Sequence, residues 1–254
     1  MKIRTFGDFG RQKECERRLK AINKQSSYKT LFLLPIPTSR DGIYINGTQK
    51  TLESLLPEIE EGDFVAGYNI PEPYASRMAE LGAHIYDAGL DEGFLCDNAD
   101  LTARGALGRI LCEFATDMSE MKIAVVGYGR IGKRLLRYLL FLGADVTVYT
   151  GKKSTCLELS LEGASVRRTS DSIDMTGLDL LINTAPAHLI SDSTVDSLGA
   201  AQRIIDLASG RFIKDAPGVI KLASVPDSMY PRTAGGLYAK YIARYLFDDR
   251  EETV

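Results

Sequence analysis

The chain has 254 residues, which is enough for two small domains with a proper hydrophobic core. Apolar residues make up 44% and charged residues 26%, and the net charge of −3 contains no block of like charge. This balance is typical of a soluble globular protein and argues against a nucleic-acid partner, whose phosphates would need a basic surface.

The cysteines and the start of the chain indicate a compartment. Cys15, Cys96, Cys112 and Cys156 form no Cys-x-x-Cys pair and have no zinc-site spacing. No apolar signal-peptide core follows the first residues, and no apolar run approaches the ~20 residues that cross a bilayer. We therefore expect a reduced, cytoplasmic protein with no metal site and no membrane partner.

The first hundred residues are predicted to form a small α/β domain. A continuous apolar run at 31–34 ends at Pro35, as expected of a buried parallel strand that opens into a loop. Further strands are expected at 64–67 and 83–86, a short one at 43–45 before the Asn46-Gly47 turn, and helices at 12–24 and 71–81.

The rest of the chain alternates strands with helices. A helix is expected over 102–117, with Thr102 as its N-cap and an apolar face made by Leu107, Ile110, Leu111 and Phe114. Strands are expected at 122–126, 145–149, 165–168, 179–182, 203–206 and 219–223, with helices at 130–142 and 156–161. A last helix starts at or just after Pro231, because proline suits the first helical turn.

This alternation predicts an α/β fold with a doubly wound parallel sheet. We place that sheet in a domain at 101–231. The second, smaller α/β domain occupies 1–100 and is completed by helix 232–247, so that two long helices join the domains.

A glycine-rich turn follows the strand at 122–126. Its residues are Gly127, Tyr128, Gly129, Arg130, Ile131 and Gly132. The first glycine permits the tight turn, the second lets a pyrophosphate approach the backbone, and the third lets the helix lie close to the strand. Free N–H groups at the helix start then favour the anion. We therefore predict a Rossmann-type dinucleotide-binding domain in which these six residues contact the cofactor; the alternative is a Rossmann fold that has lost its ligand.

The end of the second strand of this unit indicates which dinucleotide binds. NAD sites usually have Asp or Glu there, which binds the ribose 2′-hydroxyl. Here Thr150 ends the strand, and Lys152, Lys153 and Ser154 follow it, so no acid would repel a 2′-phosphate. We expect NADP(H) in preference to NAD(H); the alternative is a basic loop that is merely solvated.

Two later strand ends are expected to face the nicotinamide half of the cofactor, because ligands bind at the carboxyl ends of parallel strands. These are the turns after 179–182 and 203–206, and the cofactor contacts expected there are Thr184, Ala185, Pro186 and Ala208.

The chain has only two histidines. His188 follows the first of these turns and is either a proton donor or a cap or surface residue, whereas His84 lies on a predicted strand and is expected to be structural. The Arg, acid and His set of a 2-hydroxy-acid dehydrogenase is missing, so no catalytic acid or base is assigned.

With these segments in place, the chain resembles the family of the A-type subunit of dipicolinate synthase, made during sporulation, most clearly over about residues 93–247. The shared segments are the turn at 127–132, Asn183-Thr184-Ala185-Pro186, Asp206-Leu207-Ala208-Ser209 and Pro231-Arg232-Thr233-Ala234-Gly235. The loop from Leu33 to Gly42 and the start around Gly7-Asp8 and Arg11-Gln12 are similar too. The N-terminal region is shorter than in the family.

The resemblance implies a reaction, the oxidation of dihydrodipicolinate to dipicolinate with a pyridine nucleotide and a flavoprotein-like second subunit. The substrate carries two carboxylates. Arg232 and Thr233 are candidates for one of them and Thr38 and Ser39 for the other. Pro35, Thr102 and Ser209 are further candidate substrate contacts, and we expect a homo-oligomer.

Two alternatives remain open. The chain could be a nucleotide-binding regulatory or scaffold subunit with no turnover of its own, because no general base is apparent. It could also be a dehydrogenase of a different small carboxylate.

Overall fold

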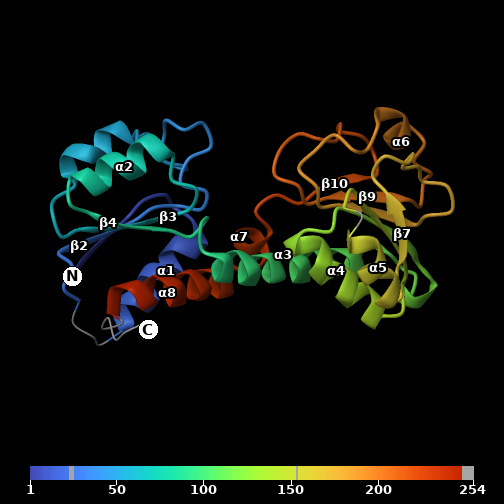
Figure 1. Cartoon of the computed structure of the whole chain (residues 1–254), viewed down its shortest axis with the longest axis horizontal. Coiled ribbons are helices and arrows are strands. Elements are labelled where there is room, and N and C mark those ends of the chain that lie inside the picture. The colour runs from blue at the N-terminus through green and yellow to red at the C-terminus, as the bar shows by residue number, and fades with distance from the viewer. Residues whose placement is uncertain (23–25, 153, 248–254) are drawn as a thin grey trace. The chain divides into compact units, whose positions relative to one another are not determined.

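The computed structural model describes residues 1–22, 26–152 and 154–247 and divides into two compact units (Figure 1). The first unit combines Met1–Asn98 with Met229–Val254, and the second is Ala99–Ser228. The domain boundaries expected from the sequence follow residues 100 and 231, whereas the units divide after residues 98 and 228. The predicted fold class is confirmed, since each unit is a parallel sheet packed with helices.

The first unit has a four-stranded parallel sheet in the order β1-β2-β3-β4. The strands are β1 (Lys2–Thr5), β2 (Thr30–Leu33), β3 (Phe64–Gly67) and β4 (His84–Asp87). The helices are α1 (Gly10–Ala21), the 3₁₀ helix η1 (Glu53–Glu58), α2 (Glu72–Glu80) and α8 (Pro231–Phe247), and α3 (Glu92–Glu113) begins in this unit.

Helices cover both faces of this sheet. On one face α1 and α8 contribute Leu19 and Ile242 to the core, and on the other η1 and α2 contribute Leu55 and Met78. Burial on both faces explains why the inner strand β2 is a nearly continuous apolar run.

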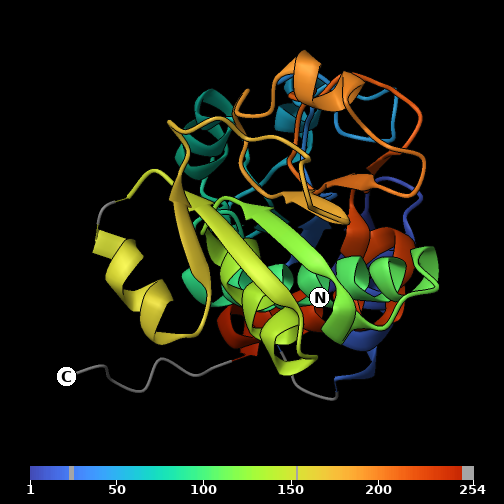
Figure 2. The same ribbon diagram turned by 90° about the vertical axis from the view of Figure 1, so that its right-hand side faces the viewer.

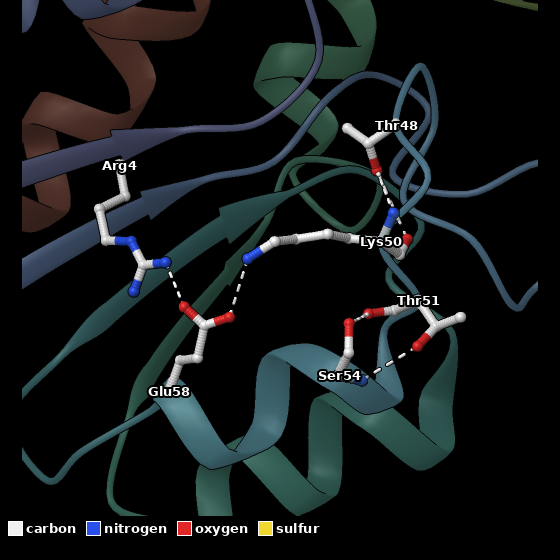
Figure 3. A network of polar contacts seen from close by, with 6 residues as sticks. All are labelled: Arg4, Thr48, Lys50, Thr51, Ser54 and Glu58. Carbon is white, nitrogen blue, oxygen red and sulfur yellow. Dashed lines mark hydrogen bonds and ion pairs between the residues drawn. The ribbon is translucent and has the colours of Figure 1, made fainter.

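Polar contacts tie the edge strand β1 to η1 (Figure 3). The Glu58 carboxylate accepts hydrogen bonds from the Arg4 guanidinium and from Lys50 Nζ, the latter at 2.9 Å. Lys50, followed by Arg4, lowers the pKa of the Glu58 carboxyl below its ordinary value. Just before η1, Thr51 Oγ1 accepts the Ser54 N–H at 3.1 Å. These contacts hold the segment around Lys50 close to the edge strand.

Helices α1 and α8 pack closely because α8 has a glycine at the contact. A Cβ at Gly235 would lie 2.5 Å from the carbonyl oxygen of Arg11 and 3.0 Å from the amide nitrogen of Cys15. Both of those atoms belong to the backbone of α1, so they cannot move aside as a side chain would. Gly235, which ends the Pro-Arg-Thr-Ala-Gly segment, is therefore a packing residue.

The second unit has a six-stranded parallel sheet in the order β10-β9-β8-β5-β6-β7 (Figure 2). Its strands are β5 (Lys122–Val126), β6 (Asp145–Thr150), β7 (Ser165–Arg168), β8 (Leu180–Asn183), β9 (Arg203–Asp206) and β10 (Val219–Lys221). The order reverses at β5, where successive connections leave towards opposite edges, as in the Rossmann arrangement.

The helices of this unit are unequally divided between the faces. They are the end of α3, the 3₁₀ helix η2 (Met118–Glu120), α4 (Arg130–Phe141), α5 (Ser154–Leu161), α6 (Asp192–Asp196) and α7 (Val225–Met229). One face packs against α3, α4 and α5, with Ile110, Leu135 and Leu159 in its core. The opposite face is covered by α6 and loop residues such as Ile173 and Ile213.

The predicted helix start at Thr102 is wrong. Helix α3 begins at Glu92, and Asp91 Oδ1 accepts the Phe94 N–H at 3.0 Å, so Asp91 is the capping residue. Thr102 lies in the middle of the helix and is only 8% exposed. The helix also ends at Glu113, and Leu111, which the apolar pattern places inward, is exposed.

Other expectations fail at polar or short segments. The helix predicted at 12–24 ends at Ala21, because Ile22 is extended; residues 23 and 24 lie outside the described residues. Instead of a strand at 43–45, a single antiparallel bridge joins Tyr44 to Thr51. Strand β1 is not among the predicted strands. Of the two long helices expected to join the units, α3 crosses from one to the other, whereas α8 lies within the first.

Among the described residues, no helix has the length and apolar content needed to span a membrane.

Candidate functional site

The glycine turn (residues 127–132) joins β5 to α4 in the second unit. Gly127 has a φ of 98°, a conformation that favours glycine, and its N–H donates to the Tyr149 carbonyl at 2.9 Å. Gly129 is the N-cap of α4 and provides no side-chain cap, so no cap side chain occupies the N–H groups of the first helical turn. A Cβ at Gly129 would meet no atom within 4 Å from the described parts of neighbouring elements. This open, uncapped helix start has the features of an anion site.

Gly132 allows the helix to approach the turn. A Cβ there would collide with the carbonyl oxygen of Gly127 and lie 3.2 Å from Thr184 Oγ1. The neighbouring strand thus supports the turn directly, since Thr184 Oγ1 also donates to the Val126 carbonyl at 3.0 Å. Thr184 therefore helps to fix the turn.

The ends of β8 and β9 are joined by a buried amide–carboxylate contact. Asn183 and Asp206 are paired in register, and Asn183 Nδ2 donates to Asp206 Oδ1 at 2.9 Å. The same Asp206 oxygen accepts the Ala208 N–H at 3.1 Å, and Asn183 Oδ1 accepts the Ala185 N–H at 3.2 Å. This strand-end pair, Asn183 with Asp206, holds both following turns in place.

Neither member of the strand-end pair has a role predicted from the sequence. The available signal is a polar residue directly after the apolar core of two strands, Leu-Leu-Ile in β8 and Ile-Ile in β9. Both side chains are almost fully buried, Asn183 at 1% and Asp206 at 3% exposure, so their hydrogen bonds must be satisfied within the protein.

At the end of β6, one of the residues predicted to contact the cofactor is buried and others are exposed. Thr150 is buried, and its Oγ1 lies 3.1 Å from Thr155 Oγ1 and accepts the Lys152 N–H at 3.3 Å. Its hydroxyl therefore shapes the loop. Lys152 and Ser154 are exposed and no acid follows the strand directly, while Lys153 lies outside the described residues.

Tyr128, Arg130 and Ile131 differ in orientation. The Tyr128 ring packs beside Lys133, whose Nζ lies 4.8 Å from the ring centre, and burial with nearby Glu162 raises the pKa of Tyr128 to about 12. Ile131 packs against the core, whereas Arg130 is exposed at the first position of α4.

In the turns after β8 and β9, the remaining predicted cofactor residues lie near the surface. Ala185 and Ala208 are half-buried, and Pro186 is exposed. Ser209, a predicted substrate contact, is exposed beside Ala208. His188 is exposed, and its Nδ1 lies 3.1 Å from the Phe212 carbonyl oxygen, so it pairs with the loop that follows β9.

Of the remaining substrate candidates, Thr102 is buried within α3 in the second unit, and the others belong to the first unit. Pro35 and Thr38 are buried, and Thr38 Oγ1 accepts the Tyr68 N–H at 2.8 Å. Thr38 therefore holds the loop after β2, and its contact with substrate stays a prediction. Ser39 is half-buried and its Oγ accepts the Gly42 N–H at 3.0 Å.

Arg232 and Thr233 are exposed in the first turn of α8. Pro231 anchors that turn, because a Cβ at Gly10 would lie 2.8 Å from the Pro231 Cβ. His84 is exposed on the edge strand β4, with its ring 5.0 Å from that of Tyr28.

Part of the chain matches a known family model. Residues 105–221 match the model described as the NAD binding domain of D-isomer specific 2-hydroxyacid dehydrogenases. Together with the open glycine turn, this match supports a nicotinamide-dinucleotide-binding domain of the dehydrogenase type in the second unit.

The resemblance to the A-type subunit of dipicolinate synthase is confirmed. Over 139 residues the chain is 27% identical to that protein of Bacillus subtilis (strain 168), a stretch that covers 52% of this chain and 47% of the relative. The match thus spans about half the length of the curated relative.

Solved structures share the fold. The structure of the A-type subunit of dipicolinate synthase from Bacillus halodurans is similar with a TM-score of 0.75 at 18% identity, covering 97% of this chain and 98% of the other. D-lactate dehydrogenase from Escherichia coli is similar with a TM-score of 0.63 at 13% identity, covering 96% of both chains.

Proposed function

We propose that this chain is the NADP(H)-dependent oxidoreductase subunit of a dipicolinate synthase-type enzyme. It would act in the cytoplasm during sporulation, oxidising dihydrodipicolinate to dipicolinate. The observation that carries the proposal is the open, uncapped helix start at Gly129 in a chain similar to the A-type subunit of dipicolinate synthase.

The reaction is a two-electron oxidation. Dihydrodipicolinate and NADP⁺ give dipicolinate, NADPH and a proton; a bound nicotinamide supplies the hydride acceptor. The substrate ring becomes aromatic as it loses hydride, so positioning of the two reactants can provide much of the rate acceleration. The glycine turn would bind the pyrophosphate, and the turns held by the strand-end pair would orient the nicotinamide half.

The two substrate carboxylates require hydrogen-bond donors and positive charge. Arg232 and Thr233 are exposed at the start of α8, where the helix dipole favours an anion. We assign one carboxylate to them and keep Ser39 and Ser209 as further candidates.

The preference for NADP(H) rests on the end of β6. No acid follows Thr150 directly, and the exposed side chains of Lys152 and Ser154 can approach a 2′-phosphate. We expect Lys152→Glu to weaken NADPH binding and to leave NADH binding nearly unchanged. Tighter binding of NADH than of NADPH by the unaltered chain would contradict the preference.

A second candidate function is a nucleotide-binding subunit that does not turn over. The observation in its favour is that His188, the histidine near these strand ends, is exposed and contacts the Phe212 carbonyl of a surface loop, and no general base is assigned among the described residues. The flavoprotein-like partner would then provide the catalytic groups. A homo-oligomer is compatible with either function.

A turnover assay separates the two candidates. The purified chain is given dihydrodipicolinate and NADP⁺, with and without the flavoprotein-like partner, and dipicolinate and NADPH are followed by absorbance. Equal amounts of dipicolinate and NADPH support the oxidoreductase. Tight NADPH binding without product under either condition supports the non-catalytic subunit, and turnover only with another small carboxylate changes the substrate.

A further inference from the structure

Strand β7 brings an arginine-bearing strand end next to the end of β6. The two strands are parallel neighbours, and Arg168 is paired in register with Thr150. Their backbones are therefore about 4.8 Å apart, the ordinary spacing of adjacent strands. The pairing continues one residue further, because the Thr169 N–H donates to the Thr150 carbonyl at 3.3 Å. Arg168 thus lies beside the position where a ribose 2′-substituent is expected.

The side of the sheet on which Arg168 lies follows from its neighbours. Thr150 contacts Thr155 of α5, and Val166 packs in the core shared with α4 and α5. Side chains alternate along a strand, and paired residues of parallel strands share a face. Arg168 is therefore on the α5 side of the sheet, with the loop that contains Lys152.

Arg167 belongs to the opposite side. Its Nη1 lies 3.5 Å from the hydroxyl of Tyr149, whose ring is in the core of the other face. Arg167 also helps to lower the pKa of Asp174, although the Thr176 N–H has the larger effect. The two adjacent arginines thus present equal charges to different faces.

The guanidinium of Arg168 has no charged partner within the described part of the chain. Its side chain is exposed and has no ion pair or hydrogen bond there, and the same holds for the Lys152 ammonium group. The first acid after β7 is Asp171, whose carboxylate accepts the Arg168 backbone N–H at 2.9 Å. In that contact, one Asp171 carboxylate oxygen accepts a hydrogen bond from the backbone. Asp171 therefore shapes the turn that follows Arg168.

The loops after β6 and β7 also touch each other. A Cβ at Gly151 would lie 3.3 Å from Thr169 Oγ1. Lys152 comes one residue after Gly151, and Arg168 comes one residue before Thr169. Two cationic residues, one after β6 and one at the end of β7, are therefore neighbours at the carboxyl edge of the sheet.

We propose that Arg168 is a specificity-determining residue that binds the 2′-phosphate of NADP(H) together with Lys152. This rests on the proposed NADP(H)-dependent function and extends it. A guanidinium provides two parallel N–H donors for phosphate, and Lys adds a compact charge from the other side. The residue lies about 18 positions after Thr150, so a search restricted to the loop after the second strand overlooks it.

The test compares Arg168→Ala with Arg167→Ala, which removes the same charge from the same strand on the other face. Dissociation constants for NADPH and NADH are measured by calorimetry, with 2′,5′-ADP and 5′-AMP as probes of the phosphate itself. We expect Arg168→Ala to weaken NADPH and 2′,5′-ADP binding about 10- to 100-fold, the usual effect of losing a charged hydrogen-bond donor. NADH and 5′-AMP binding, and all binding to Arg167→Ala, should change less than about twofold.

The outcomes separate this inference from the function on which it rests. A wild-type chain that binds NADPH no more tightly than NADH overturns the cofactor preference and the inference with it. A wild-type preference that persists in Arg168→Ala, or an equal loss of NADPH and NADH affinity, overturns the inference alone. Partial recovery by Arg168→Lys supports it, and an unchanged melting temperature shows that the exposed side chain does not act through folding.

Discussion

In each unit, the connection from the first strand to the following helix contains glycines: β1 to α1 in the first unit and β5 to α4 in the second. The two connections differ in the space that these glycines leave open. In the first unit, a Cβ at Gly7 would lie 2.8 Å from the Phe9 ring, so the chain fills its own turn. In the second unit, a Cβ at Gly129 would meet nothing within 4 Å. Glycine after a strand therefore does not by itself indicate a ligand. The space that its missing side chain leaves open does.

The units also resemble each other at one point. Each sheet has an aspartate as the last residue of a strand that fixes the neighbouring turn. Asp87 accepts the N–H groups of Asn69, Ile70 and Gly89 at 2.7–2.8 Å, and Asp206 accepts from Asn183 and Ala208. The same device is thus used once in the unit whose first β-α turn is filled and once in the unit whose first β-α turn is open.

The largest expected effect comes from removing these aspartates. Asp206→Ala leaves two N–H donors without their acceptor and Asp87→Ala leaves three, so each should cost roughly 2–4 kcal/mol of unfolding free energy. Only Asp206→Ala should also weaken NADPH binding. Denaturant unfolding and calorimetry measure the two quantities. Equal loss of NADPH affinity in Asp87→Ala would remove the distinction between the units.

The glycine turn allows a second comparison within the second unit. Gly132→Ala forces a methyl group against the Gly127 carbonyl and should destabilise the unit by about 2 kcal/mol. Gly129→Ala meets no protein atom, so it should melt like the unaltered chain and yet bind NADPH at least about tenfold more weakly, since the methyl group enters the pyrophosphate space. Unchanged NADPH affinity in Gly129→Ala would place the phosphates elsewhere.

Packing of α8 on α1 gives a smaller effect in the first unit. Gly235→Ala should cost about 1–2 kcal/mol, because its methyl group meets the Arg11 carbonyl and the Cys15 amide. Gly236→Ala meets only the flexible end of Arg18 and gains helix propensity, so it should be neutral or stabilising by up to about 1 kcal/mol. Thermal melts compare the two. Similar melting temperatures would show that α8 shifts freely on α1.

The smallest effect is a pH dependence at the exposed surface of α1. Hydrogen bonds from Arg17 and Arg18 lower the pKa of Glu14 from 4.5 to about 2. A lowered folded-state pKa gives stability that is present above pH 4.5 and is lost as the pH falls towards 2. The melting-temperature difference between Glu14→Gln and the unaltered chain should therefore be small at pH 6 and vanish near pH 2.

Glu80→Gln is the matched control for that measurement, because Glu80 has no ion pair among the residues that the structure describes. A pH-dependent difference of the same size in Glu80→Gln would show that net charge, not the Arg17 and Arg18 contacts, is responsible.

The inner strands of both sheets can be predicted because they are buried on two faces and form apolar runs. The strands at 64–67, 122–126 and 203–206 have the predicted bounds. The edge strand β1 escapes prediction because Ile3 is the one apolar residue among its four, so it forms no apolar run. The predicted start of α3 is too late because Gly93, Asp97 and Asn98 interrupt the helical pattern of its first turns and its true cap, Asp91, lies just before Glu92.

The candidate site divides in the same way. The glycine turn is local in sequence, so its pattern alone identifies it. The strand-end pair and the Arg168–Thr150 pairing depend on which strands are neighbours and in what register. The spacing of residues in the sequence gives neither the strand order nor the register. A one-residue shift of register would separate both pairs.

The first unit is built from two chain segments that the second unit separates in the sequence, and this affects the order in which the protein can fold during synthesis. Its sheet and α1 are translated early, but Tyr238, Ile242 and Leu246 of its core lie in α8, beyond the entire second unit. At 5–20 residues per second a ribosome needs roughly 7–26 seconds to add the intervening residues. During that time the second unit can fold as an uninterrupted piece, while the first keeps an apolar face that only the end of the chain can cover. The apolar face of the first unit therefore stays exposed on the nascent protein until α8 has been made.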